Sequence, residues 1–189
     1  MSPQEKLHFG KKSLGLWLEI TKKHGSLIRA FNPSESHQAY KHYPCDDIIS
    51  NCRSLQYFYH SHRNSGEHGH IHIFRKNFDT SQTNHLLAIG LSDRGLPVSL
   101  FTVNTEIVNE EPIEREALKK LFNKSLKKSQ NETLLTSWII AFCNFYKSEI
   151  TNLLASDFLS ENHSNENDIN TCKLINWEED LELSENNAC

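Results

Sequence analysis

The twenty residues from Tyr57 to Lys76 read YFYHSHRNSGEHGHIHIFRK, and the predicted fold and site both start from them. They contain five of the eleven histidines of the chain. Read with the period of two of a β-strand, the segment predicts two strands joined by a polar turn. One face of both strands carries the histidines, and the other carries aromatic and branched residues. The histidines are His60 and His62 in the first strand and His68, His70 and His72 in the second.

The register of this hairpin decides whether the histidines meet. If residues 63–67 form the turn, His60 lies opposite His70 across the antiparallel pair. In the same register His62 lies opposite His68. Opposed side chains lie roughly 5 Å apart, so four imidazoles can share one metal ion. A slip of one residue would send His62 and His68 to opposite faces and remove the cluster.

A run of alternating histidines is often only the solvent-facing side of a sheet. Five of them on one face need another explanation, because histidine has no special preference for strands. Packed imidazoles are also costly unless a metal, an anion or hydrogen bonds use their lone pairs and protons. The pattern therefore predicts a ligand-binding or catalytic role.

Two further strands are expected after the hairpin. The runs NHLLAIGLS (84–92) and LPVSLFTVN (96–104) are separated by Asp93-Arg94-Gly95, which is typical of a hairpin turn. The simplest arrangement is an antiparallel meander of four or more strands within residues 55–108. His85 opens the third of these strands.

Helical periodicity flanks the predicted sheet. We expect an N-terminal helix within residues 4–31, interrupted by glycines, and then a long irregular connection over 32–54. Two C-terminal helices are expected over 114–128 and 131–159, the second with a wide apolar stripe. This stripe should pack on the aromatic face of the sheet, which leaves the histidine face open to solvent or covered by the 32–54 connection. The fold class is therefore α+β.

The C-terminal segment differs in composition from the rest. Residues 159–189 contain eight acidic side chains and one lysine, and their main apolar group is the island Leu174 to Trp177. Such a segment buries too little to offset its ordering entropy. We expect a single domain over 1–159 and an acidic tail without stable structure over 160–189, dispensable for folding.

Composition excludes some functions. The net charge is −4 and no concentrated basic stripe is present, which argues against nucleic-acid binding. No apolar run approaches the ~20 residues of a membrane span, and the N-terminus lacks the apolar core of a signal peptide. The five cysteines are odd in number and include no C-x-x-C pair, so reduced thiols in a cytoplasmic protein are expected.

Several blocks resemble an uncharacterised bacterial family catalogued as domain of unknown function 6969. They are HYP at 42–44, QYFYHSHR at 56–63, GEHGHIHIFRK at 66–76 and HLLAIGLSDRGLPVSLFTVN at 85–104. The similarity covers most of residues 40–158, and the chain departs from it at TVNTEIVNE (102–110). The motif positions implied by the resemblance are His60, His62, Glu67, His68, His70, His72, Arg75 and His85. The family label carries no activity.

HGHIHIF at 68–74 is also similar to the strand signature of the histidine triad proteins. That likeness implies a nucleotide hydrolase or transferase in which His70 attacks phosphorus. Gly69 stands where the signature has a hydrophobic residue, and His60 and His62 have no role in it.

The leading hypothesis is a metal-dependent enzyme, a hydrolase or an oxygenase, acting on a small-molecule substrate. The expected ligands are His60, His62, His68, His70 and His72, and the expected cofactor is a divalent transition metal, zinc or iron first. Glu67 is a candidate ligand or general base, and Arg75 a candidate for steering an anionic substrate. These two residues and His70 are the catalytic candidates.

A non-enzymatic metal-binding or interaction module is the alternative. The acidic C-terminus resembles export signals of effector proteins from intracellular bacteria, which would carry the protein out of the cytoplasm where it is made. A closed four-ligand site would favour this alternative, and an open coordination position would favour the enzyme. The oligomeric state stays open at this point.

Overall fold

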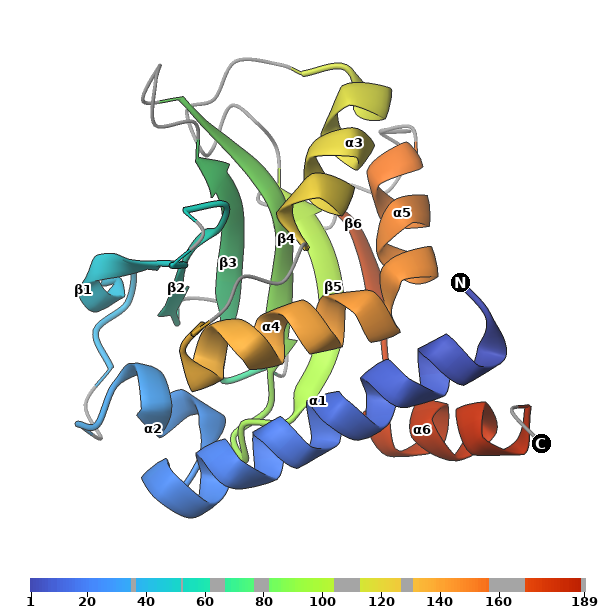
Figure 1. Cartoon of the computed structure of the whole chain (residues 1–189). Coiled ribbons are helices and arrows are strands. Elements are labelled where there is room, and N and C mark those ends of the chain that lie inside the picture. The colour runs from blue at the N-terminus through green and yellow to red at the C-terminus, as the bar shows by residue number, and fades with distance from the viewer. Residues whose placement is uncertain are drawn as a thin grey trace.

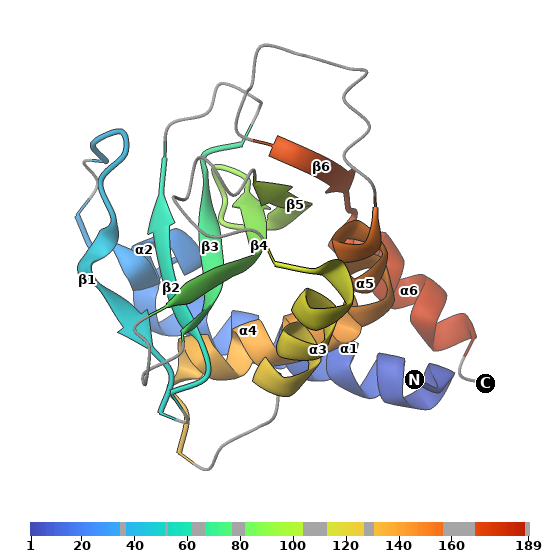
Figure 2. The same cartoon turned by 90° about the horizontal axis from the view of Figure 1, so that it is seen from above.

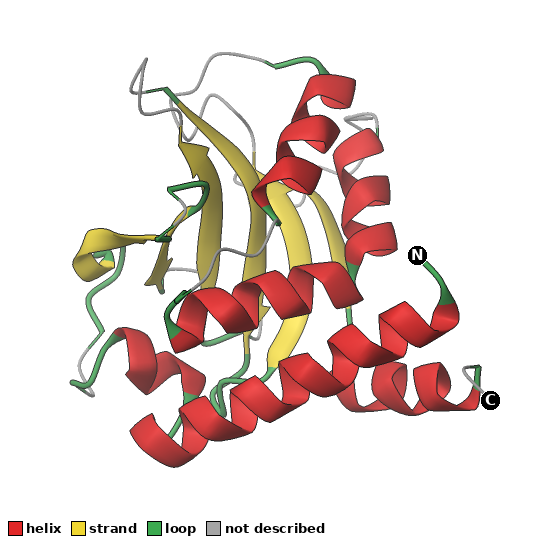
Figure 3. Ribbon diagram, viewed as in Figure 1, coloured by secondary structure: helices red, strands yellow, loops and turns green. Residues whose placement is uncertain are grey.

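The computed structural model has an antiparallel sheet of six strands in sequence order, covered on one face by helices (Figure 1, Figure 3). The predicted α+β class is therefore confirmed. The structure describes residues 1–34, 37–51, 53–61, 67–76, 82–103, 113–126, 131–156 and 169–187. The strands are β1 (Tyr43–Ile49), β2 (Gln56–His60), β3 (Gly69–Lys76), β4 (Thr83–Leu91), β5 (Pro97–Val103) and β6 (Ile169–Leu174). The helices are α1 (Pro3–His24), α2 (Leu27–Phe31), α3 (Arg115–Ser125), α4 (Leu134–Phe145), α5 (Lys147–Ala155) and α6 (Trp177–Asn186).

The N-terminal helix is interrupted, as predicted. Ser2 and Glu5 form a capping box at the start of α1, which satisfies two backbone donors there. The helix ends at His24 and is capped by Gly25, whose φ of 89° suits a residue without a Cβ. Ser26 caps α2 by accepting from the backbone N–H of Arg29. None of the described helices is both long and apolar enough for a membrane crossing.

The predicted meander corresponds to β2 through β5, and the structure adds a strand at each edge. At one edge, β1 lies within the region expected to be an irregular connection, so that expectation was wrong for residues 43–49. The pairing of β1 is itself irregular: Tyr43 lies opposite Tyr59 and Ile48 opposite Tyr57, which leaves four residues of β1 in a bulge. Proline and two aspartates in this strand hide it from a propensity-based prediction.

The main core lies between the sheet and the helices, which form a layer on one side when the molecule is seen from above (Figure 2). The predicted aromatic face is confirmed: Tyr57 and Tyr59 are fully buried, and the Tyr57 hydroxyl is 2.8 Å from Thr136 Oγ1 of α4. The apolar stripe after residue 131 is also buried, but it forms two helices instead of one. The break lies at Tyr146, whose φ of −93° and ψ of 22° turn the chain between α4 and α5.

The structure also differs from the expectation of an unstructured acidic tail. β6 extends the sheet next to β5, and α6 packs against α1 (Figure 1). Trp177 is only 4% exposed, and its ring meets those of Trp17 and Phe142 edge to face. The expectation was therefore wrong for residues 169–187, because one buried tryptophan and a strand ladder supply what the acidic composition lacks. Residues 160–168 lie outside the described part.

Candidate metal centre

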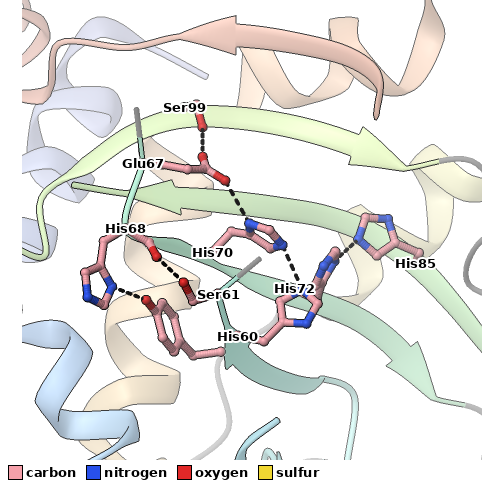
Figure 4. Close-up of polar contacts among 9 residues, drawn as sticks. His60, Ser61, Glu67, His68, His70, His72, His85 and Ser99 are labelled. Atoms are coloured by element: carbon pink, nitrogen blue, oxygen red, sulfur yellow. Dashed lines mark hydrogen bonds and ion pairs between the residues drawn. The ribbon is translucent and has the colours of Figure 1, made fainter. Parts of the chain in front are cut away.

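Three of the predicted histidines meet on the face of the sheet that is turned away from the helices. β2 and β3 pair so that His60 lies opposite His70 and Phe58 opposite His72. This is the predicted register, and it is confirmed for every described pair of the two strands. Since alternate residues share a face, His60, His70 and His72 point toward one another (Figure 4). We call these three residues the histidine trio.

The trio has the spacing of a ligand set. Each residue offers one nitrogen, and these nitrogens all lie within 4.8 Å of one another. His60 Nε2 and His70 Nε2 are 2.7 Å apart. Three nitrogens bound to one tetrahedral zinc ion at its usual bond length would lie about 3.3 Å apart, so side-chain shifts of about 1 Å would form the site. The trio is buried, with exposed fractions of 9%, 1% and 6% for His60, His70 and His72.

A carboxylate fixes the proton position on His70. Glu67 Oε1 is 2.8 Å from His70 Nδ1, and the Glu67 side chain is only 4% exposed. Because a carboxylate accepts, Nδ1 carries the proton and Nε2 keeps its lone pair, directed at the trio. Ser99 of β5 donates to Glu67 Oε2 at 3.2 Å and holds the carboxylate in place (Figure 4). Glu67 thus lies behind a candidate ligand and orients it.

Gly90 makes room for this carboxylate. It lies opposite His70 on one side and opposite Ser99 on the other, one residue before the end of β4. A Cβ at this position would collide with Glu67 Oε2 and Ser99 Oγ. The absence of a side chain therefore lets Glu67 reach His70. Sequence reasoning missed both Gly90 and Ser99; a lone glycine inside an apolar strand is the available signal of a close approach.

His85 orients His72, as Glu67 orients His70. Its Nε2 is 2.9 Å from His72 Nδ1. Burial lowers the pKa of His85 to about 3, with a smaller contribution from the nearby His70, so His85 is neutral and can accept the proton of His72 Nδ1. His72 Nε2 is then the candidate ligand atom. A bulge in β4 brings His85 opposite Phe74, because Leu86 is the extra residue and turns into the main core.

Apolar side chains surround the trio. The rings of Phe58, Phe74 and Phe101 contact the histidines, with the centroids of Phe101 and His70 5.2 Å apart. Ala88, Phe101 and Val103 form a small apolar cluster on this face, separate from the main core. These apolar groups help to bury the trio.

The structure does not bring His68 into the trio. His68 precedes β3, so the alternation of the strand does not extend to it. Its Nδ1 lies 2.5 Å from the hydroxyl of Tyr59, which belongs to the helix-side core. Ser61 Oγ donates a hydrogen bond to the carbonyl oxygen of His68 (Figure 4). Burial, followed by the charge of Glu67, raises the pKa of Tyr59, so the phenol keeps its proton. Three alternating histidines on one face, the basis of the histidine triad likeness, are therefore not formed.

The remaining predicted residues have different outcomes. His62 lies outside the described residues. Arg75 alternates with Phe74 and so lies on the face of β3 opposite the trio, where its Nη1 donates to the carbonyl oxygen of Ser54 at 3.2 Å. In this position it holds the connection between β1 and β2 in place, and it does not line the histidine face.

Comparisons with known proteins give a family and no activity. Searches of curated proteins and of solved structures find no match. The family described as Domain of unknown function (DUF6969) matches residues 10–172, which include the whole trio, Glu67, His85 and Ser99. This match extends beyond residue 158 into β6. The chain therefore belongs to the DUF6969 family.

Proposed function

We propose that this protein is a metal-dependent enzyme with one divalent transition-metal ion bound by His60, His70 and His72. The observation that carries the proposal is the convergence of three buried imidazole nitrogens within 4.8 Å of one another. Three neutral nitrogen ligands suit zinc or iron among the common metals.

The partners behind the ligands support the proposal. Metal-binding histidines usually donate their second ring N–H to a carboxylate or another acceptor. Glu67 accepts from His70 in this way, and His85 is placed to accept from His72. With Nδ1 engaged in this way, Nε2 is the candidate ligand atom of each histidine. Glu67 and His85 thus orient two different histidines so that Nε2 of each is directed into the trio. A polar face without a metal would not require this arrangement.

An enzyme fits better than a structural metal staple. Structural zinc sites are closed by four protein ligands, whereas catalytic sites keep a position for water or substrate. Within the described part of the chain the ligand group has three members. Hydrolysis by an activated water and oxygenation at iron are the two reaction types that such a centre supports, with a small molecule as substrate.

Metal content of protein purified without a histidine tag tests the proposal. We expect about one equivalent in the wild type and less than about a tenth in the double variant His60→Ala/His70→Ala, because two of three ligands are gone. His68→Ala is the matched control, since His68 belongs to the same sequence run but contacts Tyr59. Equal metal uptake by the double variant and the wild type would reject this ligand set.

A further inference from the structure

His42 lies at the edge of the trio, on the same face of the sheet. It directly precedes Tyr43, which is paired with Tyr59, so the next position across the strands is His60. The ring centroids of His42 and His60 are 5.9 Å apart. His42 also stacks on Phe58, with the centroids 3.5 Å apart and the rings 12° from parallel. This stacking holds the imidazole beside the trio although His42 precedes the edge strand β1.

An aspartate fixes the proton position on His42. Asp47 Oδ1 is 3.0 Å from His42 Nδ1, and Gln56 donates to Asp47 Oδ2 at 2.7 Å. The four-residue bulge of β1 makes the contact possible, because Asp47 is the last residue before regular pairing resumes at Ile48. Nδ1 therefore carries the proton and Nε2 the lone pair.

The exposure of the pair suits proton exchange with solvent. The side chain of His42 is 41% exposed and that of Asp47 is 19% exposed, whereas the trio is buried. Within the described part of the chain His42 Nε2 has no hydrogen-bond partner. A histidine oriented by a carboxylate, with its second nitrogen available beside a candidate metal centre, has the arrangement of a general base.

We propose that His42 is the general base of a hydrolytic reaction at the trio and that Asp47 is its positioning residue. The inference rests on the proposed metal centre. His42 Nε2 takes one proton from a water molecule beside the trio, and the water oxygen forms a bond to the electrophilic carbon of the substrate. The bond from that carbon to the leaving group breaks, and the leaving group departs with the bonding electrons. Asp47 stabilises the imidazolium until His42 returns the proton to solvent.

Hydrolysis of 4-nitrophenyl acetate by the zinc-loaded protein tests the inference, with zinc content measured on every sample. We expect the zinc-loaded wild type to hydrolyse the ester faster than its zinc-free form does. His42→Ala should lower the zinc-dependent rate on the order of 10²-fold, the range of general base catalysis, with zinc content unchanged. Added imidazole should restore part of the rate of this variant. The zinc-dependent rate of Asp47→Asn should lie between those of the wild type and His42→Ala. His24→Ala on α1 is the matched control, and its rate should equal that of the wild type.

The outcomes separate the two proposals. A wild type without zinc refutes the metal centre itself. Zinc binding without zinc-dependent hydrolysis, or hydrolysis that His42→Ala does not change, overturns the role of His42 and leaves the metal centre standing. Loss of zinc from His42→Ala identifies His42 as a ligand and also overturns its role as a base. A rate lost in His42→Ala that imidazole does not restore means a structural role only.

Discussion

Gly90→Ala and Gly15→Ala each add one methyl group, but we expect the first to destabilise the protein and the second to stabilise it. A methyl group at Gly90 would occupy the space of Glu67 Oε2 and Ser99 Oγ and would lie 3.2 Å from Glu67 Cδ. The serine hydroxyl can rotate away, but the carboxylate has to withdraw from His70. At Gly15 in α1 the added methyl group meets nothing within 4 Å.

The magnitudes follow from the contacts. Withdrawal of Glu67 breaks a charge-assisted hydrogen bond of about 1.5–3 kcal/mol, and forcing extra volume into a packed site costs about 1–3 kcal/mol. Loss of the group that orients a metal-binding histidine typically weakens metal affinity about 10–100-fold. Gly15→Ala should instead stabilise the protein by roughly 0.5–1 kcal/mol, because alanine is the better residue inside a helix.

Two assays separate these effects. Thermal unfolding of the metal-free variants should show a melting temperature several degrees lower for Gly90→Ala and slightly higher for Gly15→Ala, at about 2–4 °C per kcal/mol for a chain of this size. Competition with a zinc indicator should show weaker binding by Gly90→Ala only. The reasoning is refuted if Gly90→Ala binds zinc as tightly as the wild type, because Glu67 would then not need the space that Gly90 leaves.

Three further predictions concern single groups. Glu67→Gln should weaken zinc affinity less than Glu67→Ala, about 10-fold against about 100-fold, because an amide oxygen can still accept from His70 Nδ1; equal zinc affinities for the two variants would contradict the orienting role. Trp177→Ala should destabilise the protein by about 3–5 kcal/mol, and a chain ending at residue 159 should melt well below the full chain, since both uncover Trp17 and Phe142; an unchanged melting temperature would mean that α6 contributes nothing to stability. Burial raises the pKa of the Cys143 thiol from 9.0 to about 12, so the unfolded chain releases this proton first as pH rises. Stability should therefore fall between about pH 9 and 12, less steeply in Cys143→Ala, as urea unfolding at each pH would measure; identical slopes would contradict this assignment.

The hairpin was predictable because its information is local. Alternation predicted the face of each residue in β2 and β3, and the assumption of a turn over 63–67 predicted the register that places His60 opposite His70. The prediction was wrong for His68 because β3 begins at Gly69, one residue later than the alternation suggests. A strand boundary depends on pairing with neighbours, which the alternation of one segment does not contain.

Other features depend on contacts between distant parts of the chain. Glu67, Gly90 and Ser99 come from three separate segments, so only the assembled sheet brings them together. The edge strands β1 and β6 contain several polar residues, so their own sequences do not predict strands. They form strands because β1 pairs with β2 and β6 pairs with β5. The break at Tyr146 carries no glycine or proline, and tertiary packing decides it.

Anomalous X-ray diffraction at the absorption edge of the bound metal tests the central claim most directly, on crystals of untagged protein purified from metal-replete cells. The account predicts one strong anomalous peak bounded by His60 Nε2, His70 Nε2 and His72 Nε2, about 2.0–2.1 Å from each nitrogen for zinc. It also predicts that Glu67 and His85 remain behind His70 and His72, outside the coordination sphere. Crystals without an anomalous peak at the trio, or with the only peak elsewhere in the molecule, would contradict it.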